Sequence, residues 1–168
     1  MAVLHCTDFF WNTNYQDMFR TLVAALTLES VMVVILFLRN IPGQALLQWY
    51  RQLGTSALIM DVLSAYVCVH TSRMITSNPL YLPLVVLLIQ IGHDLLFGLL
   101  VSRIPHGKMK VIDLFKSYAR PAIIGYDAVI VLGVLAIDVA LELAVPDKFY
   151  SLTGAISAYV GLMFVHCF

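Results

Sequence analysis

Ionisable side chains stand in the middle of the most apolar stretches of this sequence. Glu29, Asp61 and Asp127 are each flanked by Val, Leu, Ile and Ala, and His93 directly precedes Asp94. Carboxyl and imidazole groups bind protons and cations and form hydrogen bonds, so their position in apolar segments predicts a polar site. The candidate ion- or proton-binding residues are Glu29, Asp61, Gln90, His93, Asp94, Asp127 and Asp138.

No catalytic motif accompanies these residues. The sequence has no Ser/His/Asp nucleophile pattern, Walker loop, GxGxxG fingerprint or haem-attachment motif, so we assign no catalytic residue and expect no cofactor. The cysteines Cys6, Cys68 and Cys167 form no CxxC, which argues against a disulfide framework or a zinc finger. Di-iron bundles use a Glu-x-x-His motif, from which Gln90-x-x-His93 departs, so we assign no metal ligand.

The composition is that of a membrane protein. The chain has 168 residues, of which 61% are hydrophobic and 12% charged, and its mean hydropathy is +0.89. Soluble domains have about 45–50% apolar and about 25% charged residues, and so short a chain has too little interior to hide the excess. The formal net charge is +0 and no basic stripe is present, so we expect the lipid bilayer, and no nucleic acid, as a partner.

Several stretches are long enough to cross a bilayer, which needs about 20 apolar residues. We place them at 19–38, 53–71, 80–101, 121–145 and 149–168. Pro83 and Pro121 suit the first turns of two of these helices, and Pro146 suits the break before the last. The sequence therefore predicts one all-α domain over 1–168, a polytopic transmembrane helical bundle with five spans. A four-span version with a peripheral or re-entrant fifth helix is the alternative.

Most candidate residues fall at one depth. At ~1.5 Å rise per residue, one group lies about 9–14 Å from the boundary taken as cytoplasmic: Glu29, Asp61, His93, Asp94 and Asp127. Gln90 lies one turn further out, and Asp138 lies about three turns beyond Asp127 on the same helix face. Small and polar residues share the face of Asp61, and Gln90, His93 and Asp94 share a side, so we expect both faces to turn inward.

Two interpretations of this layer stay open, besides a metal-centred catalytic site as the third. No Lys or Arg occurs deep in any predicted span, so the carboxylates have no fixed countercharge and require protons, a cation or water. In the structural interpretation, protonated carboxyls, Gln90 and His93 form hydrogen bonds between helices. In the functional one, they form a path for protons or cations. Glu142 is expected to be solvated close to the outer headgroups.

Small residues mark the fifth predicted helix. Gly154-xxx-Ala158 and Ser157-xxx-Gly161 are pairs that allow close helix contact. We expect them to serve packing within the molecule rather than self-association.

Two connecting regions are expected at the membrane surface. Residues 1–18 contain a cluster typical of an aromatic belt, namely Phe9, Phe10, Trp11 and Tyr15. Residues 104–120 are predicted to form an amphipathic cytoplasmic helix. Lys and Arg are concentrated in loops 39–52 and 103–120, so the positive-inside rule places these loops in the cytoplasm and the N-terminus outside.

Three short blocks carry a resemblance. They are Ala57-Leu-Ile-Met-Asp-Val-Leu-Ser64, Gln90-Ile-Gly-His-Asp-Leu-Leu-Phe-Gly98 and Val111-Ile-Asp-Leu-Phe-Lys-Ser-Tyr-Ala119. They resemble blocks in uncharacterised multi-span proteins of large nucleocytoplasmic DNA viruses, over residues 50–140. The resemblance implies a virus-encoded protein of the virion's internal membrane or of host-cell membranes, and it brings no catalytic residues.

The first functional hypothesis from the sequence is accordingly a non-enzymatic integral membrane protein, a viral membrane or virion component that acts by packing and by contacts with other membrane or capsid proteins. The alternative is a proton or cation channel or transporter that uses the buried carboxylates and His93. The second alternative is a metal-dependent membrane enzyme.

Overall fold

The computed structural model describes residues 15–41, 43–108, 112, 113, 116 and 121–167, without the side chains of 45 and 121–123. In this part of the chain the helices are α2 (Tyr15–Arg39), α3 (Gln44–Leu53), α4 (Thr55–Ile75), α5 (Leu82–Ser102), α7 (Pro121–Ala144) and α8 (Tyr150–Cys167), with a 3-10 turn η1 (Asp147–Phe149) before α8. Five of these segments are long and apolar enough to cross a membrane, the last running from Asp147 to Cys167. The predicted all-α bundle is confirmed, and it contains the five helices that are long and apolar enough for the five predicted spans.

The first helix begins earlier than the hydropathy predicts. α2 starts at Tyr15 instead of residue 19, because a polar turn that hydropathy does not detect continues the helix before the apolar run. Asp17 lies in that turn, where a carboxylate interacts favourably with the helix dipole, and it pairs with Arg20 at 3.0 Å. α2 ends at Arg39, since Asn40 adopts a φ of 55° and donates its backbone N–H to Leu36 at 2.8 Å.

The stretch 39–52, predicted as a loop, contains the short helix α3. Leu47 and Tyr50 recur at helical spacing and are buried together with Trp49 against the spanning helices. Gly54 then adopts a φ of 56° and turns the chain directly into α4. Hydropathy does not predict α3, because its ten residues form a segment that is too short and too polar to be a membrane span.

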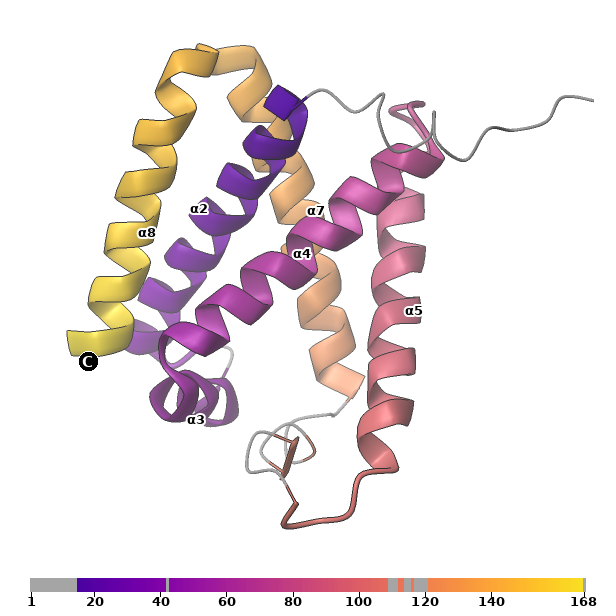
Figure 1. The fold of residues 1–168 in the computed structure, drawn as a ribbon, viewed down its shortest axis with the longest axis vertical. Coiled ribbons are helices and arrows are strands. Elements are labelled where there is room, and N and C mark those ends of the chain that lie inside the picture. Colours follow the sequence, from indigo (N-terminus) through magenta and orange to yellow (C-terminus); the bar gives the residue numbers. More distant parts are fainter. Residues whose placement is uncertain (1–14, 42, 109–111, 114–115, 117–120, 168) are drawn as a thin grey trace, which may run out of the picture.

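α2 is the central helix of the bundle, as Figure 1 shows. It packs most extensively on α8, then on α7 and α4, whereas α5 contacts α7 and α4 at the flank. The outer side of α5 is apolar and exposed, with Leu84, Leu88, Leu95 and Leu99 each more than half exposed. Such a surface suits contact with lipid chains.

The small residues of α8 pack against α2. Gly154, Ser157 and Gly161 are buried, and the hydroxyl groups of Ser157 and Thr27 form a hydrogen bond of 2.9 Å between the two helices. A Cβ atom added at Gly161 would lie 2.6 Å from Ser30 Oγ, which is closer than such contacts allow. The prediction that these residues serve packing within the molecule is confirmed.

Both predicted interfacial segments lie mostly outside the described residues. Residues 15–18 of the segment 1–18 belong to α2, and its other residues are not described. Of the predicted amphipathic helix 104–120, residues 109–111, 114, 115 and 117–120 are not described. In the remainder, Asp113 accepts a hydrogen bond from the backbone N–H of Gly107 at 2.8 Å and pairs with His106 at 2.8 Å.

Candidate functional site

Carboxylates from four spanning helices converge inside the bundle. Glu29 of α2 lies within electrostatic range of Asp61 of α4 and Asp127 of α7. Asp127 in turn interacts with Asp61 and with Asp94 of α5. We call these four residues the acid cluster. The acidic residues of the predicted layer therefore lie within electrostatic range of one another in the structure.

The acid cluster runs from the centre of the bundle to its flank. Glu29 is 4% exposed, whereas Asp61 and Asp127 are partly buried. The side chain of Asp94 is 13% exposed, and that of the adjacent His93 is 45% exposed. The expectation that His93 turns inward is wrong, because its ring stacks beside Phe97, with centroids 6.1 Å apart, along the open side of α5. The cluster therefore has a buried end at Glu29 and an open end at His93.

Tyr50 connects the acid cluster to α3. Its hydroxyl donates a hydrogen bond of 2.6 Å to Asp61 Oδ2, and the residue is 2% exposed. Burial, followed by the nearby carboxylates of Asp61 and Glu29, raises the pKa of Tyr50 well above its usual range. Tyr50 therefore stays protonated and remains a donor. Sequence reasoning missed this residue, although its spacing from Leu47 in an amphipathic stretch was a usable signal.

At the open end, Asp94 is linked to both polar neighbours on its own helix. Gln90 Nε2 donates to Asp94 Oδ1 at 2.7 Å, and His93 Nδ1 lies 3.2 Å from the same oxygen. The second carboxylate oxygen, Asp94 Oδ2, and the amide oxygen Gln90 Oε1 are buried and have no hydrogen-bond partner. Both of these atoms are acceptors, so the site lacks donors.

No fixed positive charge neutralises the acid cluster in the described part of the chain. There, no Lys or Arg nitrogen lies within 4.0 Å of a carboxylate oxygen of Glu29, Asp61, Asp94 or Asp127. Isolated buried carboxylates are very unfavourable in their charged form, so such groups hold protons or bind cations. Proton binding and cation binding are the two kinds of chemistry that such a cluster can perform.

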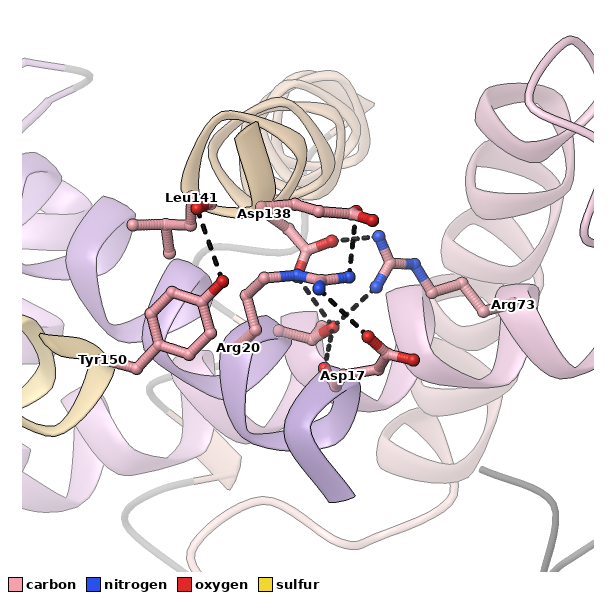
Figure 2. Close-up of polar contacts among 8 residues, drawn as sticks. Asp17, Arg20, Arg73, Asp138, Leu141 and Tyr150 are labelled. Carbon is pink, nitrogen blue, oxygen red and sulfur yellow. Dashed lines mark hydrogen bonds and ion pairs between the residues drawn. The ribbon is translucent and has the colours of Figure 1, made fainter. Parts of the chain in front are cut away.

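Asp138, by contrast, belongs to a separate group of charges, which Figure 2 shows. Its side chain is 0% exposed and pairs with Arg20 Nε at 3.3 Å and with Arg73 Nη2. Thr21 Oγ1 donates to Asp138 Oδ1 at 3.0 Å and accepts from Arg73 Nη1 at 3.1 Å. Arg20 also pairs with Asp17 at 3.0 Å and with Glu142 at 3.1 Å. We call this group the arginine network: Asp17, Arg20, Thr21, Arg73, Asp138 and Glu142.

Two predictions are corrected here. The expectation that the spanning carboxylates have no fixed countercharge is wrong for Asp138, because Arg20 and Arg73 extend from the ends of α2 and α4 into the bundle. Their long side chains reach a depth that their backbone positions do not indicate. Asp138 therefore does not join the other candidates. Glu142 has a 54% exposed side chain, in line with its expected solvation, and it also pairs with Arg20.

The described residues contain no recognisable metal-binding site. They include no group of three or more His, Cys, Asp or Glu side chains arranged to hold a metal ion. A structural or catalytic site for a transition metal needs about three or four such ligands. We therefore assign no metal ligand in the acid cluster.

These features define a class: a multi-pass, all-α membrane protein with a buried acid cluster and a separate arginine network. No protein-family model, curated protein or solved structure matches the chain.

Proposed function

We propose that this protein binds and releases protons at the acid cluster and acts in proton-linked transport across its membrane. The observation that carries this proposal is the convergence of four carboxylates from four spanning helices, with no Lys or Arg paired to them in the described residues. Intramembrane acids of this kind form the proton relays of pumps and transporters.

The arginine network makes the absence of a countercharge at the acid cluster informative. In this same bundle, two guanidinium groups neutralise the fully buried Asp138. A carboxylate that serves packing alone can be paired with an arginine. This fold provides such a pairing for Asp138 at one end of the bundle. The acid cluster keeps its carboxyl groups free of fixed charge, and that state is the one in which protons can load and leave.

The exposed His93 supports exchange at the open end of the cluster. Imidazole takes up and releases protons near neutral pH, and the side chain of His93 is 45% exposed beside Asp94. Asp94 and His93 both interact electrostatically with Asp127. Asp127 interacts in the same way with Asp61, and Asp61 with Glu29. This sequence of neighbours offers a series of proton-binding groups from the flank of the bundle to its centre.

Proton flux into liposomes containing the purified protein tests the proposal. Under an imposed pH gradient and with a potassium diffusion potential set by valinomycin, we expect a protein-dependent flux that Asp61→Asn and Asp94→Asn reduce to the level of empty liposomes. Asp113→Asn, in the loop after α5, is the matched control and should keep the flux. Unchanged flux in both cluster variants would contradict the proposal.

A second candidate follows from the exposed helix faces. α8 exposes Leu152, Ile156, Tyr159 and Met163, at spacings of a helical face, in addition to the apolar side of α5. These faces support a non-enzymatic membrane component that acts through packing and partner contacts, in the virion's internal membrane or a host-cell membrane if the resemblance to viral proteins holds. In this setting the loops 39–52 and 103–120 face the cytoplasm and the N-terminus lies outside.

Fractionation of infected or expressing cells, followed by protease treatment of sealed vesicles, tests this candidate. We expect the protein in the membrane pellet, and in purified virions if it is a virion component. Cleavage in loop 103–120 should occur where the cytoplasmic side is accessible. Recovery outside membranes, or cleavage of this loop from the opposite side, would contradict the assigned location and orientation respectively.

A further inference from the structure

Two buried oxygen atoms at the open end of the acid cluster have no donor. Gln90 is 3% exposed, and its Nε2 donates to Asp94 Oδ1 at 2.7 Å, which fixes the amide against the carboxyl group. Gln90 Oε1 and Asp94 Oδ2 are then both buried and unpartnered. Buried polar atoms in folded proteins nearly always have a partner, so a donor is missing at this point.

One proton would supply the missing donor. A proton on Asp94 Oδ2 would turn this oxygen into a donor, and Gln90 Oε1 is an unpartnered acceptor on the side chain already joined to Asp94. An amide and a carboxylic acid can share two hydrogen bonds in a closed ring, one in each direction. An ionised Asp94 provides acceptors alone and leaves both atoms unsatisfied.

We propose that Asp94 and Gln90 form the proton-binding site of the acid cluster, with the proton carried on Asp94 Oδ2 and donated to Gln90 Oε1. The inference rests on the proposed function for its role in transport, and it assigns that role to one pair of side chains. Loading forms one O–H bond at Oδ2 with a proton from water. Release returns the proton to water or to the His93 imidazole, which then faces the carboxylate as an imidazolium ion.

Ionisable groups on three helices face Asp94. On α7, Asp127 adds a second acid group within electrostatic range, and on α4 the thiol of Cys68 interacts with Asp94. On α5, His93 Nδ1 lies 3.2 Å from Asp94 Oδ1. Among the described residues, no Lys or Arg nitrogen lies within 4.0 Å of an Asp94 carboxyl oxygen. The His93 imidazole, 3.2 Å from Asp94 Oδ1, is the nearest group that can carry a positive charge on release.

Infrared difference spectroscopy of the protein in lipid tests the assignment directly. At neutral pH we expect a carbonyl stretch of a protonated carboxyl group that shifts in D2O and is absent from Asp94→Asn. In Gln90→Leu the carboxyl band should remain but move to higher frequency, because the hydrogen bonds from and to the amide are lost. Asp113→Asn should leave the band assigned to Asp94 unchanged. A set of protonated-carboxyl bands that Asp94→Asn does not alter would overturn the proposal.

A second measurement separates a proton from a sodium ion, which would also satisfy two oxygen atoms. If the site holds a proton, the band assigned to Asp94 is the same in sodium and in choline buffers. A band that appears only when sodium is removed would overturn the proposal. Asp94→Asn should retain the unfolding temperature of the unaltered protein, since the asparagine amide can donate to Gln90 Oε1 and accept from Gln90 Nε2 in the same ring.

The infrared result and the flux result test the two proposals separately. A protonated Asp94 in a protein that shows no flux would keep this inference and overturn the proposed function. Flux that is lost in Asp61→Asn but persists in Asp94→Asn, with no Asp94 band in the spectrum, would keep the proposed function and overturn this inference.

Discussion

Asp138→Asn is expected to destabilise the bundle by about 3 kcal/mol, near the lower end of the effect of removing one partner of a buried ion pair. The substitution leaves Arg20 and Arg73, whose side chains are 9% and 21% exposed, facing each other without the carboxylate between them. The partial exposure of Arg73 lets it reach toward water and limits the loss. Equilibrium unfolding of the purified protein in mixed micelles measures this difference.

Two further variants identify the cause of that loss. Glu142→Gln is the matched control, because Glu142 pairs with Arg20 but has a 54% exposed side chain, and we expect a change of at most about 1 kcal/mol. Adding Arg73→Gln to Asp138→Asn removes one uncompensated cation and should recover part of the stability. If Asp138→Asn unfolds like the unaltered protein, the arginine network does not hold the bundle together.

Gly161→Leu is expected to cost about 1–3 kcal/mol or more by overpacking the contact between α8 and α2. A Cβ atom at position 161 would meet Ser30 Oγ at 2.6 Å and Leu58 Cδ2 at 3.1 Å. Ser30 is 2% exposed, so its side chain has little room to move. The helices must separate to admit leucine, which also strains the hydrogen bond between Thr27 and Ser157. The same unfolding assay measures the effect.

Gly92→Ala provides the control for helix propensity. Gly92 lies on the exposed side of α5, and a Cβ atom there meets nothing within 4 Å. Alanine at such a position should be neutral or stabilise the helix, by up to about 1 kcal/mol in soluble helices. Equal losses in Gly92→Ala and Gly161→Leu would argue that glycine matters for local flexibility and not for close contact of α2 with α8.

The five long helices could be predicted because each corresponds to a long apolar run in the sequence, and prolines mark the starts of two of them. Pro121 begins α7 as expected, and α5 begins at Leu82, just before Pro83. The ends were less certain where polar residues continue a helix. Asp17 and Arg20 pair along the first turns of α2, and this local pairing, invisible to hydropathy, extends the helix outward.

The acid cluster was also largely predictable, because depth along a straight helix follows directly from residue count. Glu29, Asp61, Asp94 and Asp127 come from four helices, and each lies within electrostatic range of at least one of the others. Two features depended on tertiary structure. Tyr50 reaches Asp61 because α3 folds back under the bundle, and Asp138 is neutralised because two arginine side chains cross from neighbouring helices. Both contacts join different helices, so the spacing of residues along a single helix does not predict them.

The position of α2 at the centre of the bundle also constrains how the protein is made. α2 is the first of the described helices to be synthesised, yet its most extensive partner is α8, which follows every other described helix in the chain. Arg20 has Asp17 as a partner on α2 itself, whereas Asp138 and Glu142 follow only with α7. The packing of α2 is therefore completed in stages, by α4, then by α7, and last by α8.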